Sequence, residues 1–265
     1  MKATLVPGID MIETISERDT MLTGTREQYF QTSRSAYSCI EKALYVSDIK
    51  PDNLKRILDF GCGYGRVLRA IKANHPQAEI TAIDLMQDAI DFCATTFDAT
   101  PILGHEDLSK LDDIGVYDLI WVGSVFTHIT AEGFRQMFSY LISHLCKDGL
   151  LVFTTHGRAA LWVIEKHRLD RSHMSKEAFF AMKEQFRIDG YGFTPYALGL
   201  VKHLVEKQGA QVSAGAYGFS CCRPEWVCRL IGEYPEVTLV SYQEGGWGKN
   251  HDVIAVQRPA DLRIV

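Results

Sequence analysis

The chain has 265 residues, 46% of them hydrophobic, so it is long enough to bury the core of one domain with an insertion. Its formal net charge is −5 and it has no lysine- and arginine-rich block, which disfavours nucleic acid as a partner. It contains no apolar run of roughly 18 residues and no secretory apolar core near its start, so we expect a cytoplasmic protein without a membrane span.

The cysteines argue for reduced thiols rather than for disulfides or a metal. There are seven of them, an odd number, and no two have the C-x-x-C spacing. Most fall on apolar helix faces, as buried free thiols do in cytosolic proteins. We therefore expect no zinc or other metal site.

The start of the chain predicts an arm followed by a helix. Residues 1–24 have no clear pattern. Thr25 lies three residues before Gln28, which is the spacing of a capping box, and apolar residues follow at helical intervals. The helix should end before Pro51, because the residue before a proline disfavours the helical conformation.

The most informative stretch is a glycine turn between a strand and a helix. Residues 57–60 form a short, nearly continuous apolar run, typical of a buried strand. Gly61, Gly63 and Gly65 follow, and residues 67–71 have a helical apolar pattern. Glycine permits positive φ and the close approach of a ligand to the backbone.

The pattern Asp59-x-Gly61-x-Gly63-x-Gly65 differs by one residue from the G-x-G-x-x-G fingerprint of dinucleotide-binding proteins. It resembles the first motif of the class I S-adenosylmethionine-dependent methyltransferases, in which the turn wraps the amino-acid part of the cofactor and binds no phosphate. The resemblance implies S-adenosyl-L-methionine as the cofactor. It also implies six contacts in this stretch: Asp59, Gly61, Cys62, Gly63, Gly65 and Arg66.

The next two strands predict contacts for the nucleoside. Residues 79–84 form a second strand that ends in Asp84, a carboxylate able to accept from both ribose hydroxyls, with Leu85 beside it. A short third strand over 100–104 leads to Asp107 and Leu108. In the resembled family this position supplies an acid for the adenine amino group and a backbone N–H for the ring. Glu106 is the alternative acid.

The fourth strand, residues 117–122, ends in the second specific match. Ser-Val-Phe-Thr-His, residues 124–128, resembles a motif in a branch of these methyltransferases that acts on small molecules. Ligands of open α/β sheets bind beyond the carboxyl ends of the strands. We therefore expect Gly123 and Ser124 to border the methionine end of the cofactor, with His128 nearby.

The second half of the chain predicts the rest of the sheet and a cap. A helix over residues 131–145 and a fifth strand over 150–155 bring His156 to the same edge. Residues 158–218 break the strand–helix alternation, with a glycine- and aromatic-rich loop at 190–196, and we interpret them as a substrate cap. Its aromatic rings form either an apolar pocket or a small core of the insertion itself. After a helix that begins at Pro224, strands over 237–242 and 251–257 flank a loop that should carry Trp247 and His251 to the active edge.

These observations predict a doubly wound, Rossmann-like α/β fold: a seven-stranded, mostly parallel sheet with an antiparallel last strand and a helical cap. We divide the chain into an N-terminal arm and lid helix (1–50), a cofactor-binding core (51–157), a cap insertion (158–218) and the C-terminal part of the core sheet (219–265). The expected activity is methyl transfer to a small molecule such as a sugar, a lipid-linked compound or a natural product. The candidate general bases are His128, His156 and His251, because an unperturbed histidine titrates near pH 6.5. The alternatives are a non-catalytic binding protein with the cofactor fold and a nicotinamide-dependent oxidoreductase, while the oligomeric state is not predicted.

Overall fold

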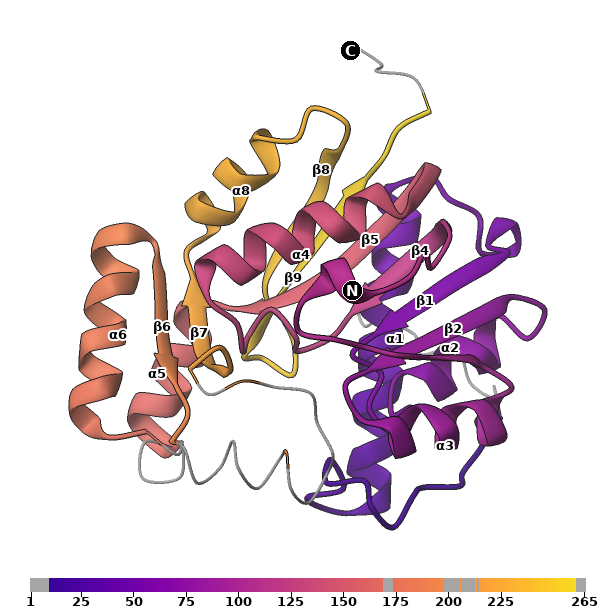
Figure 1. Ribbon diagram of the computed structural model, residues 1–265, viewed down its shortest axis with the longest axis horizontal. Coiled ribbons are helices and arrows are strands. Elements are labelled where there is room, and N and C mark those ends of the chain that lie inside the picture. The colour runs from indigo at the N-terminus through magenta and orange to yellow at the C-terminus, as the bar shows by residue number, and fades with distance from the viewer. Residues whose placement is uncertain (1–9, 169–173, 198–204, 206–212, 214, 261–265) are drawn as a thin grey trace, which may run out of the picture.

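The computed structural model describes residues 10–168, 174–197, 205, 213 and 215–260 (Figure 1). Helix α1 (Arg26–Val46) begins with the expected capping box: the Thr25 side chain accepts from the Gln28 N–H, and the Gln28 side chain accepts from the Thr25 N–H. No helix in these ranges is long and apolar enough to span a membrane.

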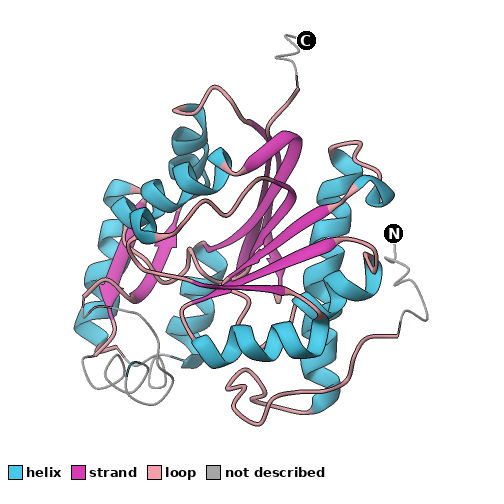
Figure 2. Cartoon of the chain, turned by 45° about the vertical axis from the view of Figure 1, so that its right-hand side comes forward, coloured by secondary structure: helices cyan, strands magenta, loops and turns pink. Residues whose placement is uncertain are grey.

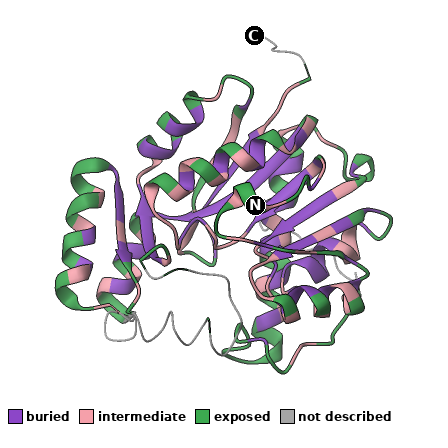
Figure 3. Cartoon of the chain, in the orientation of Figure 1, coloured by how far each residue is buried: buried purple, intermediate pink, exposed green. Residues whose placement is uncertain are grey.

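The core is a seven-stranded sheet, which confirms the expected fold. Its spatial order is β3-β2-β1-β4-β5-β9-β8, and β9 alone runs antiparallel to its neighbours. The strands are β1 (Arg56–Phe60), β2 (Glu79–Asp84), β3 (Thr100–Leu103), β4 (Tyr117–Val122), β5 (Leu145–His156), β8 (Thr238–Trp247) and β9 (His251–Gln257). The central strands are buried because helices cover both faces, as Figures 2 and 3 show.

Each face of the sheet has its own apolar core. Side chains of α1, α2 (Leu68–Asn74) and α3 (Gln87–Phe97) pack on one face. On the other face lie α4 (Ala131–Ser143) and α8 (Pro224–Gly232). The 3₁₀ turns η1 (Pro51–Asn53) and η2 (Leu108–Lys110) precede β1 and β4. The alternation of strand and helix that the sequence shows thus becomes a three-layer domain.

The segment after β5 forms a separate cap. It contains α5 (Arg158–Val163), a π-helical turn η3 (Ile164–Arg168), α6 (Lys176–Asp189), β6 (Tyr191–Pro195) and β7 (Gly218–Cys222). Strands β6 and β7 pair in antiparallel register as a second, two-stranded sheet with its own apolar cluster. The expectation of a loop at 190–196 was therefore wrong. Its partner lies more than twenty residues later in the chain, so local sequence did not reveal the pairing.

Strand β7 also ties the cap to the core. The Gly218 N–H donates to the His128 carbonyl at 2.8 Å and the Ser220 N–H to the Thr127 carbonyl at 2.9 Å. We had assigned residues from 219 onward to the core sheet. Strand β7 pairs instead with β6 of the cap, so the boundary at 218/219 falls inside a cap strand. The division otherwise stays a prediction.

Two strands are longer than the sequence indicated. β5 begins at Leu145, because Leu145 pairs with Tyr117 before an irregularity in the register. β8 continues to Trp247, so the connection to β9 is only residues 248–250. His251 lies directly opposite His156 across the β5–β9 pair.

Candidate functional site

The glycine turn leaves the end of β1 with an open backbone. Gly61 and Gly63 have φ values of +79° and +51°, which favour glycine. A Cβ on Gly61 would lie 2.3 Å from Cγ2 of Val125, whereas a Cβ on Gly63 would meet nothing within 4 Å. Gly61 is therefore required by packing, and Gly63 borders space in which a ligand can approach the main chain.

Asp59, just before this turn, is a buried acid without a counter-charge. The residue is 2% exposed, and its Oδ2 has no hydrogen-bond partner among the residues that the structure describes. Burial and the neighbouring Asp84 raise the pKa of the Asp59 carboxyl from 3.8 to about 8. A buried oxygen without a hydrogen-bond partner is rare in proteins and needs a physical explanation.

Asp84 lies one strand away and is held by the same turn. Its Oδ2 accepts the Gly63 N–H at 2.7 Å, and its Oδ1 accepts the Met86 N–H at 3.1 Å. Burial raises the pKa of Asp84, while these backbone donors oppose the shift. Leu85 is half-buried beside it. The turn and the second acid thus form one rigid unit at the ends of β1 and β2.

The other predicted residues of the turn are arranged as follows. Cys62 is buried, with its sulfur 4.0 Å from that of Cys93, and this contact together with burial raises the pKa of the Cys62 thiol well above its ordinary value. Arg66 is half-buried, with its guanidinium 6.0 Å from the centroid of the Trp247 ring. No carboxylate in the described part of the chain lies within ion-pair distance of Arg66.

The predicted adenine-side residues lie at η2. Asp107 caps this turn: its Oδ1 accepts from the Ser109 N–H at 3.1 Å and from the Ser109 hydroxyl at 2.7 Å, and these bonds lower its pKa. Leu108 is half-buried. Glu106 instead accepts the Ser213 N–H at 2.7 Å, which joins the cap to this edge of the sheet.

The end of β4 is strained. Ser124 has a φ of +62°, although it is not glycine, and strain of this kind is concentrated at functional sites. Its N–H donates to Oγ1 of Thr154 at 2.8 Å, and its Oγ lies 3.3 Å from Nε2 of His251. A Cβ on the preceding Gly123 would lie 2.7 Å from Nε1 of Trp121, so a glycine is required there.

The structure brings the three candidate bases together. The ring centroids of His128 and His156 are 6.5 Å apart, and those of His156 and His251 are 4.7 Å apart. His156 is 7% exposed and stacks on Phe219, with ring centroids at 4.6 Å. Burial lowers the pKa of His128, and burial with the two neighbouring imidazoles lowers the pKa of His156 further, so both rings are neutral at pH 7.

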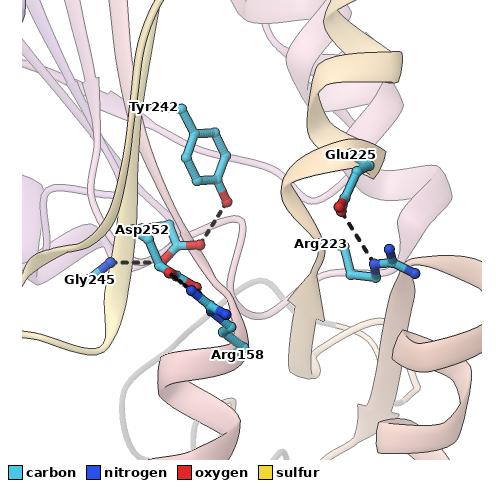
Figure 4. Close-up of polar contacts among 7 residues, drawn as sticks. Arg158, Arg223, Glu225, Tyr242, Gly245 and Asp252 are labelled. Carbon is cyan, nitrogen blue, oxygen red and sulfur yellow. Dashed lines mark hydrogen bonds and ion pairs between the residues drawn. The ribbon is translucent and has the colours of Figure 1, made fainter.

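The sequence analysis missed Asp252, which fixes the end of β9. This carboxylate is fully buried and accepts the Tyr242 hydroxyl at 2.7 Å and the Gly245 N–H at 2.9 Å (Figure 4). A Cβ on Gly157 would lie 2.2 Å from its Oδ2, so β5 can leave the sheet here only through a glycine. The signal was an acid inside an otherwise apolar strand, which requires internal partners when it is buried.

The N-terminal arm is held by a buried arginine. Arg69 of α2 has no exposed surface and donates to the Ile12 carbonyl at 2.6 Å and the Thr14 carbonyl at 3.1 Å. The Tyr29 hydroxyl donates to Asp19 at 2.6 Å, and Tyr37 pairs with His75 at 2.9 Å. The hydroxyls of both tyrosines therefore have partners within the protein.

A hollow lies at the opposite end of the sheet, and two of the acids that line it already accept hydrogen bonds from the backbone. It has a volume of about 610 Å³, and its lining includes Asp118 and Asp148. Asp118 accepts the N–H groups of Lys55 and Arg56, and Asp148 accepts that of Ala260. Nowhere in the described ranges do three His, Cys, Asp or Glu side chains form a group suited to a metal ion.

Comparison with known proteins shows that part of the chain is similar to methyltransferases. Residues 58–151 match the family described as "Methyltransferase domain". A malonyl-[acyl-carrier protein] O-methyltransferase of Bacillus anthracis is 33% identical over 104 residues, covering 39% of this chain and 38% of that protein. One from Anoxybacillus flavithermus is 28% identical over 148 residues, covering 56% of this chain and 54% of that protein. The chain thus spans roughly two fifths to half of the length of these relatives.

A solved structure shares the fold. The crystal structure of an S-adenosylmethionine-dependent methyltransferase from Clostridium acetobutylicum superimposes with a TM-score of 0.55 at 11% identity, covering 86% of this chain and 92% of that one. The strand order and the antiparallel β9 agree with this similarity. Residues 58–151 therefore match a methyltransferase domain, and the chain shares the fold of a solved S-adenosylmethionine-dependent methyltransferase.

Proposed function

We propose that the chain transfers the methyl group of S-adenosylmethionine to a small-molecule acceptor. The observation that carries this proposal is the unpaired, buried Asp59 next to Asp84 and the open glycine turn. The malonyl-[acyl-carrier protein] named for the relatives is one possible acceptor. Sugars, lipid-linked compounds and natural products are others.

The charges of the described residues fit this cofactor. S-adenosylmethionine carries a sulfonium, an ammonium and a carboxylate. Asp59 lacks a positive partner, and an ammonium beside it would supply one. Arg66, which has no ion-pair partner in the described ranges, would hold the carboxylate, and Asp84 would accept from the ribose hydroxyls.

The same charges disfavour a nicotinamide cofactor. Its pyrophosphate is anionic, would approach the glycine turn between Asp59 and Asp84, and would make ionisation of these buried carboxyls still less favourable. The cationic methyl donor would instead stabilise the ionised form of both carboxyls. The electrostatics of the site therefore favour methyl transfer over hydride transfer.

S-adenosylmethionine supplies an activated methyl group on a positively charged sulfur. The protein's part is to hold the acceptor in line with that methyl group and to exclude water, since orientation alone contributes up to about 7–11 kcal/mol. The cap is placed for this task because β7 hydrogen-bonds to residues 127 and 128 at the end of β4. Two of its aromatic side chains, Tyr196 and Tyr217, lie beside His128 at this edge.

Calorimetry with S-adenosylhomocysteine, the demethylated product, tests the cofactor site. Asp84→Ala should weaken binding by about 1–3 kcal/mol, roughly 5- to 150-fold, because hydrogen bonds to a charged group are lost. Asp113→Ala is the matched control: Asp113 also accepts a backbone N–H, that of Gly115 at 2.8 Å, but it precedes β4 at the opposite end of the sheet. Equal affinity of the Asp84 variant and the parent protein would contradict the assignment.

A further inference from the structure

The three histidines at the edge of the sheet are not equivalent. His156 is enclosed: it is 7% exposed, its ring stacks on Phe219, and its Nδ1 is shut off from solvent without a partner in the described ranges. His251 uses both ring nitrogens, with Nδ1 at 3.2 Å from the Asn250 side-chain oxygen and Nε2 at 3.3 Å from Oγ of Ser124. Neither ring is well placed to take a proton from an acceptor.

His128 differs because its tautomer is fixed by the cap. Its Nδ1 lies 2.9 Å from the Gly218 carbonyl oxygen, which can only accept, so Nδ1 carries the hydrogen. Nε2 of the neutral ring is then the basic nitrogen. No described residue forms a hydrogen bond with this atom, and the ring is only half-buried. Nε2 of His128 is therefore the available base.

The walls around His128 are aromatic, and burial and the nearby carboxyl of Asp84 together raise the pKa of the Tyr217 hydroxyl. The Tyr217 ring lies 5.0 Å and the Tyr196 ring 5.9 Å from the imidazole, centroid to centroid, and Phe219 stacks on His156 behind them. In the described part of the chain, no lysine or arginine contacts these rings. A carboxylate acceptor would be buried here without a counter-charge from the described residues, which is costly, whereas an uncharged ring can pack its apolar face on the aromatic side chains.

We propose that the acceptor is an uncharged ring alcohol, either a phenol or a sugar hydroxyl, and that Nε2 of His128 is its general base. This inference rests on the proposed methyltransferase function. The acceptor oxygen forms a bond to the methyl carbon while the carbon–sulfur bond breaks, and the electron pair of that bond stays on sulfur. The hydroxyl proton passes to His128 and later to solvent, so the products are a methyl ether and neutral S-adenosylhomocysteine.

The first experiment measures binding to the full chain loaded with S-adenosylhomocysteine, by saturation-transfer NMR. The probes are phenol, methyl α-glucopyranoside, benzoate and benzylamine. We expect one of the two neutral probes to bind in preference to the charged ones, and which one binds separates a phenolic from a sugar acceptor. Preference for benzoate or benzylamine, or binding of none of the four, overturns the proposal.

The second experiment measures methyl-ether formation from the neutral probe that binds. His128→Gln should lower kcat at least 100-fold and remove the acidic limb of the pH profile, while changing the Kd for S-adenosylhomocysteine less than threefold. His144→Gln is the matched control, because Nδ1 of His144 also lies 2.6 Å from a backbone carbonyl, that of Gly115, far from the site. Turnover by the His128 variant at the parent rate, or no ether from any bound neutral probe, overturns the assignment.

These experiments distinguish failure of the proposed methyltransferase function from failure of the proposed acceptor class. If S-adenosylhomocysteine does not bind, the methyltransferase function itself is wrong. If it binds and a charged probe is preferred or methylated, the function stands and only the acceptor class and the role of His128 are wrong.

Discussion

Replacing Asp59 by asparagine should make the protein more stable at high pH. Below about pH 4 the carboxyl is protonated in both the folded and the unfolded chain. Between pH 4 and about 8 the unfolded chain loses this proton while the folded protein keeps it, because burial raises the pKa of Asp59 to about 8. The free energy of unfolding therefore falls as pH rises through this window.

The size of the effect follows from the shift. Raising the pKa from 3.8 to about 8 is a change of roughly four units, and each unit corresponds to about 1.4 kcal/mol. At pH 9 the parent protein thus loses on the order of 5 kcal/mol that the neutral, isosteric Asp59→Asn variant retains. At pH 5 the two should differ by no more than about 2 kcal/mol.

Urea denaturation from pH 5 to 9 measures this difference, and calorimetry adds a second readout. The variant should bind S-adenosylhomocysteine more weakly, since it cannot form the ionised partner of the ammonium. In the parent protein, binding at pH 7 should release roughly one proton, visible as an enthalpy that depends on the buffer. Parallel stability curves for the two proteins across the whole range would refute the reasoning.

Two further changes test the scaffold of the site. Asp252→Ala should destabilise the protein by about 2–4 kcal/mol in urea denaturation, because it leaves the half-buried Tyr242 hydroxyl and Gly245 N–H without their acceptor; a loss below about 0.5 kcal/mol would contradict this. His156→Phe should reduce the loss of stability on acidification, since the folded pKa of His156 lies well below 6.5 and the unfolded chain alone takes up that proton as pH falls below this value. Melting temperatures at pH 5 and 7 check this, and an unchanged difference between them would count against it.

The arrangement of the glycine turn and its two acids, which we propose as the cofactor site, was predictable because its signals are local. A strand that carries Asp59 near its end, a glycine turn and a helix lie within about fifteen consecutive residues, and Asp84 ends the next strand. In a parallel sheet, consecutive strand ends meet at one edge, so the pattern fixes the geometry without knowledge of the tertiary contacts. The three histidines were placed at this edge by the same argument, and the structure brings their rings together.

The surroundings of His128, where we propose that the acceptor binds, were not predictable, because they depend on contacts between residues far apart in the chain. Tyr217 lies beside His128 only because β7 crosses the end of β4, and that crossing depends on pairing between β6 and β7 over an intervening segment. Asp252 is an acid within an apolar strand, and the sequence alone does not reveal that Tyr242 and Gly245 donate hydrogen bonds to it. Contacts between residues distant in the chain leave little trace in local periodicity.

The antiparallel β9 divides the edge of the site into a part that can vary in length and a part that cannot. After β5 the chain already accommodates the whole inserted cap, because extra residues at this position lengthen a connection outside the sheet and leave the strand register unchanged. Between Trp247 and His251, by contrast, one added residue would shift β9 by a position, turning His251 away from His156 and moving Asp252 away from Tyr242 and Gly245. New acceptor preferences in descendants of this protein should therefore arise in the cap, while the short turn before His251 keeps its length.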